Sequence, residues 1–413
     1  MANLDAGDSG GGVEGTYFPR GFNLKNVVGP ILAQSYRSPV VERLKQLDFA
    51  ARAGPLTLRL AREFGFCYGV DRAVEYAYET RERFPHKRIF LPGEIIHNPE
   101  VNARLAERGI RPLPDARDPE VRYADVSRDD VVILPAFGVP VPEMAHLRAK
   151  GCLLVDTTCG SVLNVWKNVR RYARDGFTSV IHGKHYHEET RATASVARAE
   201  QDGHYLCVLD RAEAEVVCDF IRGRRPAAEV LDAFRDATSP GFEPGRDLER
   251  IGLANQTTML MSESLAIQEA LREAMRERHG EAALGERFRS FDTICSATQD
   301  RQDAVLRLLE DGGLDVMVVI GGYNSSNTQA LARICAERLP TFHVSGPDRI
   351  EGESIRHQPV GRHEEATTRG WLPTGTAVVG LTAGASTPNS VVGDVVERIL
   401  ALRGLSAADL APA

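Results

Sequence analysis

The chain has 413 residues, 43% of them hydrophobic and 26% charged, with a formal net charge of −7 at pH 7. These values are typical of a globular protein of two or three domains, and no run approaches the length of about 18 apolar residues that spans a membrane. The acidic balance, without any basic stretch carrying interleaved aromatic residues, argues against a general nucleic-acid surface. Seven cysteines without disulfide-like spacing favour a reducing compartment.

The first segment, residues 1–15, is rich in glycine and aspartate. It lacks the basic and apolar regions of a secretory signal and the arginine and serine bias of a transit peptide. We therefore expect a disordered tail on a cytoplasmic protein. Residues 17–52 predict a charged, partly helical lead-in, with a short helix at 39–46.

From residue 56 onward, short β-rich runs alternate with amphipathic helical stretches, the pattern of α/β units with mainly parallel sheets. The predicted strands lie near 56–64, 88–96, 130–135, 153–157, 179–182, 205–209, 250–255, 316–320, 341–344 and 377–381. The predicted parts of the chain are a tail and lead-in at 1–55, α/β domains at 56–152, 153–288 (with a polar insertion at 222–250) and 289–404, and a C-terminal tail at 405–413.

Three cysteines, Cys67, Cys159 and Cys295, each stand where an apolar run ends and a helical pattern begins. Each unit is thus predicted to open with a strand, a cysteine and a helix, a structural repeat without sequence identity. A thiol at a helix N-terminus is expected to have a lowered pKa, because unpaired N–H groups favour the thiolate, the form that binds metals. The wide spacing excludes a zinc knuckle, a C-x-x-C redox pair and the clustered cysteines of a ferredoxin.

The alternative is that a cysteine is only a small buried hydrophobic residue. Four others fit that alternative, since they lie inside apolar or helical runs: Cys152, Cys207, Cys218 and Cys335.

Five polar clusters follow predicted strands, at the edge where open α/β sheets bind ligands. They occupy residues 93–98, 182–190, 255–258, 321–328 and 382–387. Taken singly, each suits a structural histidine, a helix cap or an ordinary turn. Together with the three cysteines, they predict one shared cavity. Histidines, hydroxyls and backbone N–H groups suit a diphosphate, and three thiolates leave one iron of a cubane cluster free to bind a substrate hydroxyl.

In chain order, these motifs closely resemble the 4-hydroxy-3-methylbut-2-enyl diphosphate reductase family, the LytB-type iron–sulfur reductases of the methylerythritol phosphate route to isoprenoids. The motifs that carry the resemblance are GFCYGVDRA at 65–73, HN at 97–98, DTTC at 156–159, HEE at 187–189, QTT at 256–258, ICSAT at 294–298, NSSN at 324–327 and TAGAS at 382–386. The resemblance implies three similar α/β domains in a trefoil around a central 4Fe-4S cluster, held by Cys67, Cys159 and Cys295.

The resemblance also implies the reaction, which is the reductive dehydroxylation of (E)-4-hydroxy-3-methylbut-2-enyl diphosphate to isopentenyl and dimethylallyl diphosphate with two electrons. It gives Glu189 the role of proton donor and places Thr257 beside the substrate alcohol. The diphosphate-binding residues that it implies are His97, His187, Ser325, Asn327 and Ser386, with Ser326 close by. We expect ferredoxin or flavodoxin as the electron donor, although no local motif identifies it, and a monomer or homodimer without nucleic-acid or membrane partners.

One departure from the family pattern concerns a turn in which many members have a third phosphate-binding histidine. Here the turn has Phe137, which cannot donate a hydrogen bond. The diphosphate must then rely on other groups, and Lys184, His185 and nearby backbone amides are the candidates.

Two other classes compete with the reductase. A non-catalytic iron–sulfur redox or iron sensor would use the same three cysteines, but it leaves Glu189 and Thr257 unexplained and calls for a DNA-binding element. A sugar-phosphate isomerase would use the glycine turns and need no iron.

Overall fold

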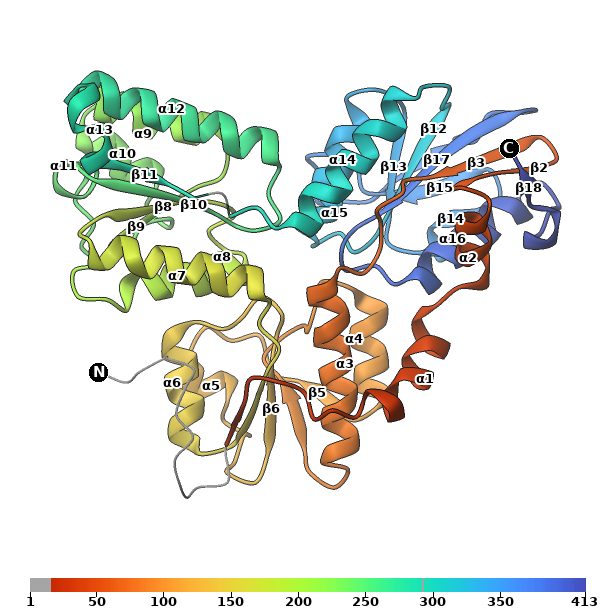
Figure 1. Cartoon of the computed structure of the whole chain (residues 1–413), viewed down its shortest axis with the longest axis horizontal. Coiled ribbons are helices and arrows are strands. Elements are labelled where there is room, and N and C mark those ends of the chain that lie inside the picture. The colour runs from red at the N-terminus through yellow and green to blue at the C-terminus, as the bar shows by residue number, and fades with distance from the viewer. Residues whose placement is uncertain (1–15, 292) are drawn as a thin grey trace.

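Three α/β lobes, each built on its own mainly parallel sheet, meet at the centre of the molecule (Figure 1). The computed structural model describes residues 16–291 and 293–413, so the tail predicted at 1–15 and Asp292 lie outside the described residues. The arrangement confirms the predicted class of three α/β units. None of the described helices is long and apolar enough to cross a membrane.

The first lobe contains a five-stranded sheet in the order β1-β7-β6-β4-β5. Its strands are β1 (Tyr17–Phe18), β4 (Ile89–Leu91), β5 (Ile110–Pro112), β6 (Val131–Leu134) and β7 (Leu153–Asp156), all in parallel pairs. The helices of this lobe are α1 (Lys25–Tyr36), α3 (Tyr68–Arg83), α4 (Pro99–Glu107), α5 (Pro119–Arg122) and α6 (Val141–Lys150). All four residues of β6 are buried, as expected of a parallel strand covered on both faces.

The second lobe contains a parallel four-stranded sheet in the order β11-β10-β8-β9. Its strands are β8 (Thr178–His182), β9 (Tyr205–Val208), β10 (Ile251–Asn255) and β11 (Phe288–Ser290). Its helices are α7 (Gly160–Arg174), α8 (Glu188–Arg198), α9 (Arg211–Ile221), α10 (Ala227–Ala233), α11 (Pro244–Asp247), α12 (Met261–His279), η1 (Glu281–Ala283) and α13 (Leu284–Arg287). The insertion at 222–250 belongs to this core, because it buries Val230, Phe234 and Leu248 there.

The third lobe contains a six-stranded sheet in the order β13-β12-β17-β3-β2-β18. Its strands are β2 (Ala50–Ala53), β3 (Leu56–Leu60), β12 (Val316–Ile320), β13 (Thr341–Val344), β17 (Ala377–Ala383) and β18 (Ala411–Pro412). Its helices are α2 (Pro39–Gln46), α14 (Ser296–Glu310), α15 (Ser326–Ala336), η2 (Pro347–Arg349), α16 (Asn389–Ala401) and η3 (Ala407–Asp409). A small antiparallel sheet of β14 (Ile350–Glu351), β15 (Ser354–His357) and β16 (Ala366–Arg369) is attached to it.

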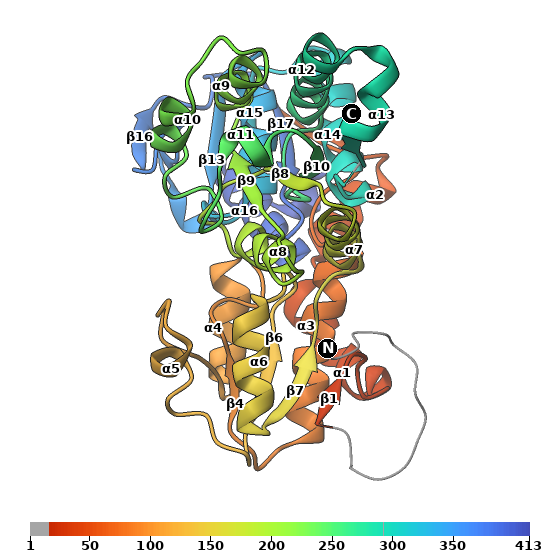
Figure 2. The ribbon, with the colours of Figure 1, turned by 90° about the vertical axis from the view of Figure 1, so that its left-hand side faces the viewer.

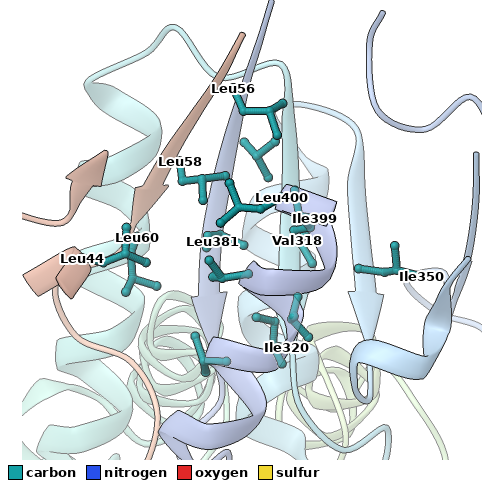
Figure 3. Packing of buried hydrophobic residues seen from close by; sticks show 14 of the residues in the cluster. Leu44, Leu56, Leu58, Leu60, Val318, Ile320, Ile350, Leu381, Ile399 and Leu400 are labelled. Carbon is teal, nitrogen blue, oxygen red and sulfur yellow. The ribbon is translucent and has the colours of Figure 1, made fainter. Parts of the chain in front are cut away.

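The core of the third lobe draws on distant parts of the chain (Figure 3). Leu44 of α2 and Leu58 of β3 pack with Val318 of β12 and Ile399 of α16, all fully buried. The second half of the lead-in and the C-terminal segment are therefore parts of this lobe, since β2 pairs with β3 and β18 pairs with β2. The first half of the lead-in, with β1 and α1, belongs to the first lobe.

The strands before the three cysteines lie in unexpected sheets. β3 pairs with β17 of the third lobe, β7 with β6 of the first and β11 with β10 of the second. The prediction that each unit opens with a strand of its own is wrong. The strand before each cysteine lies in the sheet of one lobe, and the helix after that cysteine lies in the next lobe. The chain crosses between lobes at each cysteine, and an apolar run does not reveal which sheet it will join. The domain limits drawn from the sequence remain predictions.

Two sets of helices occupy opposite sides of the molecule. In the turned view of Figure 2, α3, α7 and α14 lie on one side, and α4, α8 and α15 lie on the other. The helices of the first set each begin directly after one of the three cysteines. The helices of the second set begin at the polar clusters around His97, His187 and Ser325.

Candidate active site

The three cysteines predicted to start helices do so. Cys67, Cys159 and Cys295 are the N-cap residues of α3, α7 and α14. Each has extended backbone angles, and the thiol of Cys67 also accepts a hydrogen bond from the N–H of Val70 at 3.5 Å. The prediction of a strand, a cysteine and a helix in each segment is confirmed.

An equivalent backbone hydrogen bond holds each cysteine. In all three, the cysteine N–H donates to the carbonyl of a residue two positions after a strand of the lobe that the chain is leaving. The bonds run from Cys67 to Ala385 after β17 (3.1 Å), from Cys159 to Ala136 after β6 (2.8 Å) and from Cys295 to Thr257 after β10 (3.2 Å). The threefold repeat expected from the sequence therefore extends to the turns that hold the thiols.

The three thiols converge. A Cβ atom on Gly69 would lie 2.7 Å from the Sγ of Cys159 and 3.9 Å from the Sγ of Cys67, so only glycine leaves room there. The third thiol joins them through α14, the helix that Cys295 caps, because Arg301 of this helix reaches the segment that leads to Cys67. Arg301 connects the segments of Cys295 and Cys67, since its guanidinium donates to the carbonyl of Gly65 at 2.7 and 3.1 Å.

The pKa values of Cys67 and Cys295 differ from the expectation. Burial raises the pKa of Cys67 despite the N–H of Val70 and the charge of Arg301, which lower it. Burial raises the pKa of Cys295 to about 11, and the charges of Cys67 and Glu189 add to the effect. The predicted lowering is wrong for Cys67 and Cys295, because desolvation of the thiolate outweighs the helix N–H groups and, at Cys67, the charge of Arg301 as well.

The donor set fits a soft metal group. Three thiols from three lobes, with a glycine keeping space beside two of them, match the preference of iron–sulfur clusters for thiolate sulfur. Within the described part of the chain, the other four cysteines are buried elsewhere, in the hydrophobic clusters of the lobes: Cys152, Cys207, Cys218 and Cys335. The described part of the chain thus brings three thiols to one place.

A buried carboxyl group lies next to this thiol site. Glu189 is in the first turn of α8, and only 3% of it is exposed. Thr257 donates to it twice, from its backbone N–H to Oε1 at 2.6 Å and from its hydroxyl to Oε2 at 3.1 Å. Burial raises the pKa of Glu189 to about 7, although both bonds lower it. Near neutral pH, this carboxyl group therefore exists in both protonation states, as a proton donor requires.

Two histidines from different lobes form a hydrogen-bonded chain. Burial, with the charges of His97 and Lys184, lowers the pKa of His187 far below its usual value, so His187 is neutral. Its Nδ1 accepts the N–H of Glu189 at 3.2 Å, which places its proton on Nε2. That Nε2–H donates to Nε2 of His97 at 3.1 Å, and His97 in turn donates from Nδ1 to Glu94 at 2.9 Å.

Hydroxyl and amide groups from the third lobe complete this polar cluster. Ser325 caps α15, and its Oγ lies 3.4 Å from the hydroxyl of Ser386, which donates to the carbonyl of His97 at 3.1 Å. Gln256 donates to Ser326 at 3.1 Å. The buried Asn327 accepts the N–H of Ala385 at 2.8 Å and so supports the turn that holds Cys67.

The helix N-termini of α4, α8 and α15 therefore meet. Asn98, His187 and Ser325 cap them, and the bonds between the lobes bring the caps to one place. Helix N-termini direct free N–H groups and partial positive charge outward, so three of them make an anion site. All eleven residues predicted for the site lie in the thiol group, at the acid, or in this cluster.

The turn that departs from the family pattern has a packing role. The ring of Phe137 stacks on His97, with centroids 4.8 Å apart and planes 11° from parallel. Lys184 is close enough for its charge to lower the pKa of His187, and its Nζ donates to Gln329 at 2.5 Å. His185 instead packs against Tyr186 and lines a cavity of about 360 Å³ that lies away from this cluster, beside α6, α8 and β9. Lys184 is thus the better placed of the two candidates.

Sequence reasoning missed three residues of the site. Glu94 binds His97, and Asn324 donates to the same carboxylate at 2.7 Å. Both lie inside the polar clusters, and the three-residue spacing of Glu94 and His97 after a strand was the available signal. Arg301 lies one helical turn beyond Ala297, whose carbonyl it also binds, and no local motif marks it.

The fold and the site together define a three-lobed α/β enzyme with a soft, thiol-lined centre next to an anion-binding cluster. Residues 58–400 match the family model described as LytB protein. The chain belongs to the LytB family.

Curated relatives match almost the whole chain. The 4-hydroxy-3-methylbut-2-enyl diphosphate reductase of Synechococcus sp. (strain PCC 6301) is 47% identical over 389 residues, which cover 94% of this chain and 96% of the relative. The protein of the same name from Gloeobacter violaceus is 47% identical over 394 residues, covering 94% and 93%. The solved structure of the E-1-hydroxy-2-methyl-but-2-enyl-4-diphosphate reductase from Plasmodium falciparum covers 83% of this chain and 87% of its own, with a TM-score of 0.60 at 21% identity, and shows the same fold.

Proposed function

We propose that this chain reduces (E)-4-hydroxy-3-methylbut-2-enyl diphosphate to isopentenyl and dimethylallyl diphosphate, the last step of the methylerythritol phosphate route. The carbon–oxygen bond of the allylic alcohol breaks and a carbon–hydrogen bond forms. Two electrons and two protons are consumed, and the oxygen leaves as water. The names of the curated relatives support this reaction.

One observation carries the proposal: hydrogen bonds connect Cys295 to Thr257 and Thr257 to Glu189. Cys295 donates its N–H to the carbonyl of Thr257, and Thr257 donates its own N–H and hydroxyl to Glu189. A proton donor thus lies one residue away from a ligand of the metal group. A site for breaking a carbon–oxygen bond by reduction needs both, because hydroxide is a poor leaving group until it is protonated.

The three cysteines would hold a 4Fe-4S cluster, and when bound it supplies electrons and, at its open iron, a Lewis acid for the alcohol oxygen. Cys67, Cys159 and Cys295 each come from a different junction between lobes. Binding of the group would therefore fasten the three lobes together.

Glu189 and Thr257 would deliver the proton. When Glu189 is protonated, its acidic hydrogen on Oε2 lies toward the Oγ of Thr257, 3.1 Å away. The hydroxyl hydrogen of Thr257 is then free to point to the substrate oxygen, so the proton can pass through Thr257. Burial of both residues keeps bulk water from competing for it.

The diphosphate would bind where α4, α8 and α15 begin. His187 is neutral and holds its proton on Nε2, so it can donate to a phosphate oxygen without being charged. The hydroxyls of Ser325 and Ser386 and N–H groups in the first turns of these helices add donors. His97, Lys184 and Asn327 complete the set, with Ser326 close by. Ser326 accepts a hydrogen bond from Gln256, and Asn327 also accepts the N–H of Ala385.

The test is an anaerobic assay after reconstitution with iron and sulfide, using a low-potential chemical reductant and identifying both products by mass spectrometry. The proposal predicts both diphosphates from the parent protein and none from a Cys295→Ser variant. Iron-dependent absorbance without product would favour the iron sensor, and an activity that needs no iron would favour the isomerase.

A further inference from the structure

Glu94 fixes the tautomer of a histidine in the cluster at the starts of α4, α8 and α15. Its Oε2 accepts the Nδ1–H of His97 at 2.9 Å and a second hydrogen bond from the side-chain amide of Asn324 at 2.7 Å. Two donors that point at one oxygen suit an ionised carboxylate, which can only accept. Nδ1 of His97 therefore carries a hydrogen, and Glu94 holds it.

The other ring nitrogen of His97 is an acceptor as long as the ring is neutral. It accepts the Nε2–H of His187 at 3.1 Å. A phosphate oxygen is an acceptor too, so a neutral His97 has no hydrogen to offer it. His187 differs in this respect, because its Nδ1 accepts the N–H of Glu189 and its hydrogen is already on Nε2. His97 becomes a donor to the ligand only when it gains a proton on Nε2.

Carboxylates surround the ring of His97. The oxygen of Glu94 lies at Nδ1, and an oxygen of Glu188 lies 3.7 Å from Nε2. Glu189 is near enough for the charge of His97 to lower its pKa. A bound diphosphate would add more negative charge on the side of Nε2. Opposite charge within about 4 to 6 Å favours the charged form of a histidine.

The remaining neighbours do not oppose a positive charge on His97. Phe137 stacks on the ring, and His187 is neutral because burial and nearby charges lower its pKa. Ser386, which donates to the carbonyl of His97, is uncharged. Lys184 points its ammonium group to the side chain of Gln329, to which it donates at 2.5 Å.

We propose that Glu94 is a positioning residue that makes His97 take up a proton when the diphosphate binds, a proposal that rests on the function proposed above. A phosphate oxygen takes the place of His97 as acceptor of the Nε2–H of His187. A proton from solvent then binds Nε2 of His97, and the imidazolium donates to Glu94 from one nitrogen and to the ligand from the other. No bond to carbon changes in this step, and Glu94 acts only through the ring.

Proton uptake makes the affinity for a diphosphate depend on pH. The protonated ring stabilises the complex, so this contribution is present at low pH and is lost as the pH rises. A complex that holds one proton more than its free components weakens by about tenfold for each pH unit. The window from about pH 7.5 to 8.5 reports on the protein, because a phosphate group with a second pKa of about 6 is already ionised there.

The experiment is anaerobic calorimetry of the cluster-loaded protein with isopentenyl diphosphate, which has the diphosphate but no hydroxyl. Binding enthalpies at about pH 8, measured in buffers with different enthalpies of ionisation, give the number of protons taken up. We expect about 0.5 to 1 proton for the parent, and a Kd that rises by roughly three- to tenfold from pH 7.5 to 8.5. In Glu94→Gln, the amide can donate to Nδ1, so a neutral His97 can donate from Nε2. Its uptake should fall below about 0.2 proton, with a nearly level Kd.

Two further variants separate the hydrogen bond of Glu94 from the general charge of the site. Glu94→Asp keeps a carboxylate and should retain about half of the parental uptake or more. Glu188→Gln is the matched control, because it removes the carboxylate near Nε2 and leaves Nδ1 untouched. It should keep most of the uptake. Iron content and thermal unfolding, measured for each variant, should match those of the parent.

Binding without proton uptake by the parent would overturn the proposal, whatever the variants do. Equal uptake in the parent and in Glu94→Gln would also overturn it, since the proton would then enter another group. An equal loss in Glu188→Gln would assign the effect to charge alone and contradict the role of Glu94. Failure of the parent in the reductase assay would instead contradict the proposed function, and the calorimetry would still decide the role of Glu94.

Discussion

The space beside the thiols gives a prediction about Gly69. In a Gly69→Ala variant, the new Cβ would lie 2.7 Å from the Sγ of Cys159, where an ordinary contact needs about 3.5 Å or more. Cys159 must then move by about 1 Å, whereas metal sites tolerate deviations of only about 0.2 Å in ligand distance. We expect the variant to hold less than half of the parental iron and sulfide after anaerobic reconstitution.

The fold itself should survive this change. Alanine improves helix propensity over glycine by up to about 1 kcal/mol, and overpacking costs about 1 to 3 kcal/mol, so the two effects partly cancel. The control is Gly160→Ala, at the start of α7 beside Cys159, where an added Cβ meets nothing within 4 Å. Thermal unfolding by circular dichroism should be similar for both variants. Full iron and sulfide with an unchanged absorption spectrum in Gly69→Ala would refute the geometry given for the three thiols.

Three other predictions concern the acid and the diphosphate cluster. In Thr257→Val, the hydroxyl that bonds to Glu189 is lost, so turnover with a chemical reductant should fall by about 10²-fold; a rate within twofold of the parent would exclude this hydroxyl from proton transfer. In Phe137→His, a hydrogen-bond donor replaces the ring stacked on His97. One new hydrogen bond to the charged diphosphate should lower the KM for the substrate by up to about tenfold, at unchanged iron content. Equal KM values would argue against this position as a phosphate contact. Because burial raises the pKa of Glu189 to about 7, its protonated form is lost as the pH rises through that value, and the parental turnover rate should decline above pH 7; a rate that stays level to higher pH would contradict the assignment of the acid.

The α/β pattern was predictable because buried parallel strands are short, apolar and β-branched, as in β12 with its sequence VMVVI. The sheet to which a strand belongs was not predictable in the same way. β3, β7 and β11 precede their cysteines as expected, yet each pairs with strands of the neighbouring lobe. The pairing of strands depends on contacts between distant segments, and a single sequence does not reveal these contacts. The insertion at 222–250 reads as polar, but its few apolar residues enter the second core.

The site was largely predictable because its residues stand in short motifs at strand ends, where a helix N-terminus follows. Helix caps such as Ser325 and Asn98 follow from local chemistry. The pKa values of Cys67 and Cys295 were not predictable, because the helix effect is local whereas burial depends on all three lobes. Arg301 was missed for the same reason, since its partner Gly65 is far away in the sequence.

The most direct test of the account compares the parent with Glu189→Gln at equal cluster content, measuring anaerobic reduction of 4-hydroxy-3-methylbut-2-enyl diphosphate with a chemical reductant. Glutamine keeps the size and an oxygen acceptor for the N–H of Thr257, but it has no acidic proton. The account predicts turnover in the parent and a loss of at least about 10²-fold in the variant, with the same cluster absorbance. Equal turnover in the two proteins would contradict Glu189 as the proton donor, and an intact cluster without turnover in either would contradict the reductase function.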